Sequence, residues 1–124
     1  MSENTQDPQF EISFYEGILK KQPDFVQALI ALGDLYTKVG EIQKGYEVDV
    51  RLTALQPEDP YVFYNLACSQ SLLQNVEGAF KTIRKAVYLS YSDWAFMDDD
   101  PDLENLRKYP PYQEYLLSII KEID

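Results

Sequence analysis

Apolar residues recur along this chain at a fixed spacing of 34 residues, and this period restricts the folds that the chain can adopt. Pro23 and Pro57 lie that far apart, and each closes an amphipathic stretch. The same offset links Ile12, Tyr46 and Phe80. A fixed period of roughly 20–50 residues is typical of stacked supersecondary units, each of which buries its apolar face only against its neighbours. The sequence therefore predicts an array of repeats.

Each unit is predicted to contain two helices. Over 26–39 the apolar residues lie three or four positions apart, which is helical spacing. Gly40 follows, where the left-handed conformation that closes a helix costs least. A second helix is expected over 41–55, and the next unit repeats the pattern at 61–73 and 76–89. No segment shows the strict alternation of a strand, so the predicted class is all-α.

The two ends of the chain depart from the repeat. Asp7 and Pro8 are suited to the N-cap and first position of a helix, and that helix aligns only with the second helix of a unit. Towards the other end, short helices are expected after Asp100 and after Pro110–Pro111. We therefore expect a disordered N-terminus at 1–7 and one domain at 8–124, made of a half repeat (8–23), two repeats (26–59 and 60–93) and capping helices (94–124).

Composition narrows the functional classes. The chain has 124 residues, of which 45% are apolar, as expected for one folded domain. Its formal net charge of −10 repels phosphate backbones and anionic lipids, which disfavours nucleic acid and membranes as partners. Basic partners are favoured instead. No segment has the features of a secretory signal or a membrane span, so a cytoplasmic location is the expectation.

The residue types that most often perform catalysis are scarce. Histidine is absent from the chain, and Cys68 is the only cysteine. A lone thiol without a histidine to activate it is an unpromising nucleophile, and no phosphate-binding loop occurs. We therefore expect no catalytic residues, no cofactor and no enzyme activity. The acidic segment 98–104 lacks the glycine and spacing of a calcium loop, so helix capping explains it better than a metal site.

The repeats resemble the tetratricopeptide repeat (TPR) family, whose first helix carries the pattern W-x₂-L-G-x₂-Y. Leu29, Leu32, Gly33 and Tyr36 occupy these places in one repeat. The resemblance implies a right-handed superhelical array of antiparallel helix hairpins, with a concave groove that binds proteins. One departure is Asp49, which stands where a large apolar side chain normally packs. The corresponding places in the next repeat are Phe63, Leu66, Ala67 and Gln70.

The same resemblance indicates which side chains line the groove. Tyr64 could either face the groove or pack on the following helices, and exposure in the groove is preferred. Some family members bind a C-terminal carboxylate, and only one of the five binding places, Asn65, agrees in this chain. The five corresponding residues are Ile30, Asp34, Asn65, Ala95 and Asp99. Acids at such places suit a ligand that carries lysine or arginine. The predicted partner-binding residues are Gln27, Ile30, Asp34, Lys38, Tyr61, Tyr64, Asn65, Cys68 and Ser71.

Three functions remain open at this point. The first is an adaptor or assembly factor that binds a peptide or helix of another protein in the groove. The second is a structural protein that forms a homodimer through the open edge of the half repeat at 8–23. The third is a dedicated chaperone for a secreted substrate, a role that small repeat proteins also perform.

Overall fold

The computed structural model describes residues 7–123, so the disorder predicted for 1–7 falls almost wholly outside the described residues. Within that range the chain is all-α and contains no strand. The helices, in chain order, are α1 (Pro8–Lys21), α2 (Val26–Lys38), α3 (Ile42–Leu55), α4 (Pro60–Leu72), α5 (Val76–Tyr88), α6 (Trp94–Asp99), the 3₁₀ turn η2 (Pro101–Leu103), α7 (Glu104–Arg107) and α8 (Pro110–Ile123).

Short polar side chains start several of these helices. The Asp7 carboxylate accepts a 3.0 Å hydrogen bond from the backbone N–H of Gln9, and Asp59 accepts one of 2.9 Å from Tyr61. A proline follows each aspartate at the first helical position, where its missing N–H costs nothing. These caps satisfy N–H groups that the helix leaves unpaired, and they fix where α1 and α4 begin.

The 34-residue period is also present in the backbone at the turns within the two hairpins. Gly40 and Gln74 are 34 positions apart, and both are left-handed, with φ of 87° and 66°. Immediately after them, the N–H of Glu41 donates to the carbonyl of Tyr36, and the N–H of Asn75 donates to that of Gln70. Because the donors and the acceptors are each 34 positions apart, the two hairpins turn in the same way even where glycine is not used.

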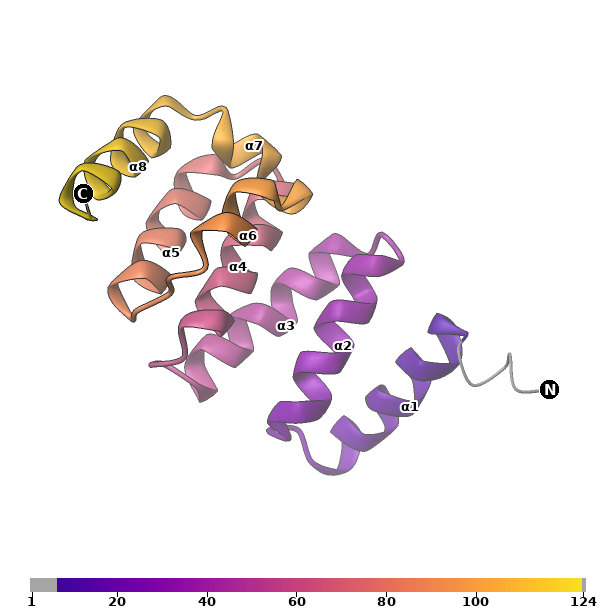
Figure 1. Ribbon diagram of the computed structural model, residues 1–124. Helices are drawn as coiled ribbons and strands as arrows, with labels where there is room; N and C mark the ends of the chain where they lie inside the picture. The colour runs from indigo at the N-terminus through magenta and orange to yellow at the C-terminus, as the bar shows by residue number, and fades with distance from the viewer. Residues whose placement is uncertain (1–6, 124) are drawn as a thin grey trace.

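Successive helices pack side by side as antiparallel hairpins and form a right-handed superhelical array of the TPR type (Figure 1). α1 and α8 lie at opposite ends of the array (Figure 1). Small residues let the helices approach closely. At Gly45, an added Cβ would lie 2.9 Å from Oγ1 of Thr37 on the facing helix. The axes of α2 and α3 can therefore approach more closely here than alanine would allow.

The core is a series of three clusters along the array, as expected when each unit packs on its neighbours. Ile12 of α1 packs with residues of α2, and Leu52 of α3 packs with residues of α2 and α4. The largest cluster joins α4 and α5 to the C-terminal helices through Ile83, Leu106 and Tyr112, each almost completely buried. The C-terminal helices therefore cover the last hairpin with apolar side chains.

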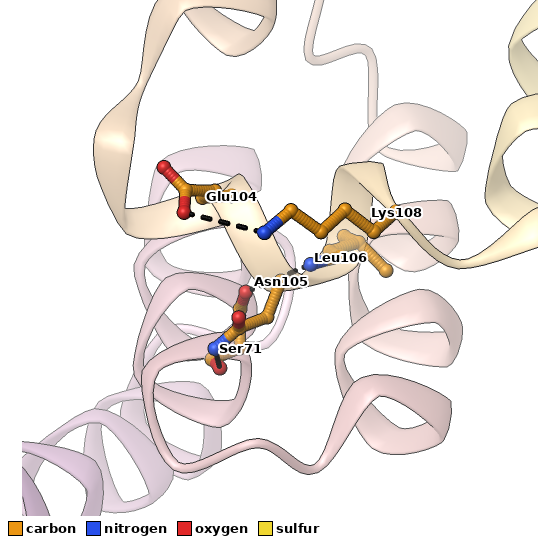
Figure 2. A network of polar contacts seen from close by, with 5 residues as sticks. All are labelled: Ser71, Glu104, Asn105, Leu106 and Lys108. Carbon is orange, nitrogen blue, oxygen red and sulfur yellow. Dashed lines mark hydrogen bonds and ion pairs between the residues drawn. The ribbon is translucent and has the colours of Figure 1, made fainter.

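Polar contacts fasten the C-terminal helices to α4 (Figure 2). Ser71 is fully buried; its hydroxyl accepts a 3.2 Å hydrogen bond from the N–H of Leu106, and its carbonyl accepts one of 2.8 Å from the Asn105 amide. The Lys108–Glu104 ion pair beside them is exposed.

Within residues 7–123, no helix combines the length and apolar character needed to cross a bilayer.

A candidate partner-binding groove

A cavity of about 350 Å³ opens between the first helices of successive units. α2 and α4 form two of its sides, α6 and the residues after it form a third, and α3 contributes to the floor. The resemblance places the concave groove along these first helices. The residues around the cavity are Ile30, Ala31, Gly33, Asp34, Thr37, Asp49, Leu52, Tyr64, Asn65, Cys68, Ser69, Leu72, Phe96, Asp100 and Asp102.

Five of the predicted partner-binding residues line this cavity, and they fall into two groups. Ile30, Asp34 and Asn65 are exposed and form part of its rim, and the Ile30 side chain is 44% exposed despite being apolar. Tyr64 and Cys68 are buried and lie deeper. The structure therefore brings together residues from α2 and α4 that are at least 30 positions apart in the sequence.

The preference for an exposed Tyr64 is wrong, because its side chain is only 3% exposed. Its ring stacks on Tyr91 with a centroid distance of 4.5 Å, and its hydroxyl donates a 2.7 Å hydrogen bond to Oδ2 of Asp100. Burial, followed by this hydrogen bond, raises the pKa of Tyr64 well above its usual range. Tyr64 supports the wall of the cavity, and a partner could touch little of it.

The remaining predicted residues lie away from the cavity. Ser71 cannot face a groove, since it is fully buried in the contacts with Asn105 and Leu106. Gln27 and Lys38 are exposed on α2, and Lys38 pairs with Asp34 at 3.4 Å. Tyr61 is 64% exposed on α4 and meets the edge of the Tyr91 ring. Gln27, Lys38 and Tyr61 are accessible to a partner that extends beyond the cavity.

Four carboxylates surround the cavity: Asp34, Asp49, Asp100 and Asp102. No lysine or arginine of the described residues lines it. Of these four acids, the sequence predicts only Asp34 in the groove. In the sequence, Asp49 is a departure from the family pattern, and Asp100 and Asp102 belong to a capping segment. The convergence of the four acids depends on how the C-terminal segment packs back on α4, which no local pattern specifies.

Asp49 is the most buried of these acids, with 7% of its surface exposed. Its Oδ2 accepts a 2.6 Å hydrogen bond from the Ser69 hydroxyl. The pKa of Asp49 is raised to about 6. Burial is the main cause, the hydrogen bond from Ser69 acts in the opposite direction, and the charge of Asp34 adds to the increase. A carboxylate kept in such a place is costly to ionise and gains from any cation that approaches it.

Cys68, Asp100 and Asp102 place one sulfur and two carboxylate oxygens within 4.8 Å of one another, close enough to hold a metal ion. Two observations argue against this use. Burial, followed by the charges of Asp100 and Asp102, raises the pKa of the Cys68 thiol well above its usual value, which keeps it protonated. Asp100 already accepts hydrogen bonds from Tyr64 and from the N–H of Asp102. The cluster is better described as an internal hydrogen-bonding network.

No protein-family model matches the chain. Over 61 residues it is 36% identical to a chloroplastic protein of Arabidopsis thaliana, a match that covers 48% of this chain and 18% of the plant protein. One crystal structure of MamA superposes with a TM-score of 0.72 at 20% identity, covering 90% of this chain and 66% of MamA. A second MamA structure gives 0.65 at 22% identity, covering 71% and 48%. The chain thus spans less than two thirds of each protein, and the likeness to MamA establishes the fold.

Proposed function

We propose that this protein is an interaction module that binds a peptide or helix of another protein in the cavity between α2, α4 and α6. The observation that carries the proposal is the arrangement of the cavity rim. Ile30, Asn65 and Phe96 present apolar and hydrogen-bonding surface from three different helices around one opening. Apolar side chains that remain exposed around a concavity are typical of a binding site.

The chemistry of the cavity supports binding over catalysis. Its one thiol, Cys68, is buried and protonated, and the chain has no histidine to activate it. The Tyr64 hydroxyl already donates a hydrogen bond to Asp100. The thiol of Cys68 and the hydroxyl of Tyr64 both contact Asp100. We therefore assign these groups a structural role around the binding surface.

Site-directed photo-cross-linking tests this proposal. A photo-reactive phenylalanine analogue replaces Asn65 at the rim, and a matched variant carries it in place of Glu47, which is exposed on α3 and does not line the cavity. The proposal predicts a discrete cross-linked segment from position 65 that is missing from position 47. The captured segment is then synthesised and must suppress the cross-link when it is added in excess. Equal cross-linking from the two positions would reject the groove.

A second candidate function is self-association through α1. Phe10 and Phe14 lie one helical turn apart and are 55% and 56% exposed, although Ile12 on another face of the same helix is buried. Two exposed phenylalanine rings on one helix face form a surface that a second copy could cover. We rank this candidate below partner binding, because two aromatic side chains provide little area for a stable dimer.

Sedimentation velocity separates the two candidates. If α1 forms a dimer, the wild-type protein sediments as a dimer at micromolar concentration, and the Phe10→Ser/Phe14→Ser variant sediments as a monomer. Tyr88→Ser is the control, because Tyr88 is 81% exposed on α5, away from α1. A wild-type protein that sediments as a monomer over the whole concentration range would dismiss self-association.

The third possibility, a chaperone for a secreted substrate, stays a prediction.

A further inference from the structure

We propose that the cavity receives a positively charged side chain, an arginine or a lysine, from the bound partner, with the cationic group placed among Asp34, Asp49, Asp100 and Asp102. This inference rests on the proposed function, since it names the chemistry of the segment that the groove binds. It follows from the charge, the hydrogen-bonding state and the shape of the cavity.

The charge around the cavity is of one sign. Four carboxylates line it and no basic residue of the described chain does. The nearest compensation is Lys38, which meets Asp34 at 3.4 Å, but both side chains are 68% exposed and such a pair contributes little. Burial, then the charges of Asp100 and Asp34, raises the pKa of Asp102. The acids therefore act on one another, and a cation among them would relieve this repulsion.

The deepest carboxylate retains an unused acceptor. Ser69 donates to Oδ2 of Asp49, whereas Oδ1 accepts no hydrogen bond from residues 7–123. The space that a side chain at Gly33 would fill lies 3.4 Å from that Oδ1. Oδ1 does not belong to the fully buried side-chain atoms that lack a hydrogen-bond partner, so this oxygen is accessible from outside the protein. A donor from outside the chain that enters the cavity could therefore form a hydrogen bond with this carboxylate oxygen.

The shape and lining of the cavity fit a long side chain with a charged end. A volume of about 350 Å³ is at the small end of ligand sites, which suits one or two side chains of a partner. Ile30 and Leu72 offer apolar surface for an aliphatic stem. Phe96 lines the cavity and is 53% exposed, so part of its ring is accessible to a cation.

Isothermal titration calorimetry with defined peptides tests the inference. The probes are short capped peptides that are identical except at one central position, which is arginine, lysine, citrulline or glutamate. Citrulline matches arginine in shape but has no charge. The proteins are the wild type, the Asp34→Asn/Asp102→Asn variant, and Glu77→Gln as a control. Glu77 is an exposed acid on α5 that does not line the cavity. All titrations contain a chelator, so that no metal ion competes.

We expect the arginine and lysine peptides to bind at least about tenfold more tightly than the citrulline peptide, because a charge-assisted hydrogen bond contributes about that much. The Asp34→Asn/Asp102→Asn variant should lose this preference, and Glu77→Gln should keep it. Equal affinity for arginine and citrulline would overturn the inference, as would an equal loss in the Glu77→Gln control. The proposed function would survive either result, because it is decided by the cross-linking at position 65.

Discussion

The Ser69 hydroxyl on α4 donates a 2.6 Å hydrogen bond to the buried carboxylate of Asp49 on α3, joining one repeat to the next beneath the cavity. The TPR resemblance implies a large apolar side chain at position 49. The neighbouring repeat has Ile83 at the corresponding place, and Ile83 is completely buried. An acid that replaces a core residue at the floor of a cavity lowers stability, and it provides negative charge where a partner can use it.

Removing the charge of Asp49 should stabilise the protein at neutral pH. Burial raises the pKa of Asp49 from 3.8 to about 6, so the native state holds this proton more tightly than the unfolded chain. The stability from this group is therefore present below about pH 4 and is lost as the pH rises towards 6. Asp49→Asn keeps an oxygen that can accept from Ser69 and should raise the free energy of unfolding by about 2 kcal/mol at pH 7.

Urea denaturation of the wild type and Asp49→Asn across the range from about pH 4 to 8 provides the measurement. The difference in free energy of unfolding should grow with pH and reach its full size above the pKa of Asp49. A constant difference at every pH would show that the charge is not responsible. The same variant should bind basic peptides less tightly, because it removes one of the four carboxylates.

Removing the hydroxyl of Tyr64 and that of Tyr112 should have different effects on the free energy of unfolding. Tyr64 donates to Asp100 at 2.7 Å, so Tyr64→Phe should lower the free energy of unfolding by about 1–2 kcal/mol. The Tyr112 hydroxyl is buried and has no hydrogen-bond partner among the described residues. Tyr112→Phe should therefore be neutral or stabilising by up to about 1 kcal/mol. Thermal or urea denaturation of both variants checks the pair, and a larger loss for Tyr112→Phe would contradict the assignment.

Glycines in two helices should differ in their tolerance of alanine. At Gly17 an added Cβ meets nothing within 4 Å, so Gly17→Ala should stabilise α1 by up to about 1 kcal/mol through helix propensity. At Gly45 the added Cβ would lie 2.9 Å from Oγ1 of Thr37. That hydroxyl donates a hydrogen bond to the carbonyl of Gly33. Gly45→Ala should therefore destabilise by about 1 kcal/mol despite the better propensity.

The double variant Gly45→Ala/Thr37→Ala is the control for Gly45→Ala. It removes Oγ1 of Thr37, the atom that the new Cβ would approach. Equilibrium unfolding of the single and double variants gives the coupling between the two positions. The double variant should recover most of the stability lost by Gly45→Ala. A Gly45→Ala protein that is as stable as Gly17→Ala would show that α2 and α3 separate easily.

Ser71 should control the attachment of the C-terminal helices. Ser71→Ala removes the acceptor of the Leu106 N–H and leaves that buried group without a partner, at a cost of about 1–2 kcal/mol. Amide hydrogen exchange should accelerate in α7 and not in α1. Ser13→Ala on α1 is the control, because Ser13 is exposed. Uniform acceleration along the whole chain would mean that the C-terminal helices do not open separately.

Much of the fold could be predicted from the sequence because the same local signals for helix ends and apolar faces occur in both repeats. Pro8, Gly40 and Pro60 mark helix ends through φ preference and the missing proline N–H, which are properties of single residues. Capping helices are predicted over 94–124, but no separate signal marks α6, since the segment Trp94–Asp99 has only six residues and carries no periodic pattern. Its helical state follows from the Asp93 cap and from burial of Met97 in the core.

The site was harder to predict, because exposure depends on the neighbour that covers a helix. The family resemblance, combined with helical spacing, predicts Ile30 and Asn65 in the groove. The burial of Tyr64 could not be predicted, since it depends on Tyr91 and Asp100, which lie in the segment where the repeat ends. The four carboxylates come from separate parts of the sequence, and only the packing of the C-terminal segment on α4 brings them together.

Chemical-shift mapping of the ¹⁵N-labelled protein with the segment captured by the Asn65 cross-linker tests the central claim most directly. Binding in the cavity predicts that the largest amide shifts occur at Ile30, Asp34, Asn65 and Phe96, and that Glu47 on α3 barely changes. Shifts centred instead on the exposed face of α1, or on α3 and α5, would place the partner outside the cavity and contradict the account.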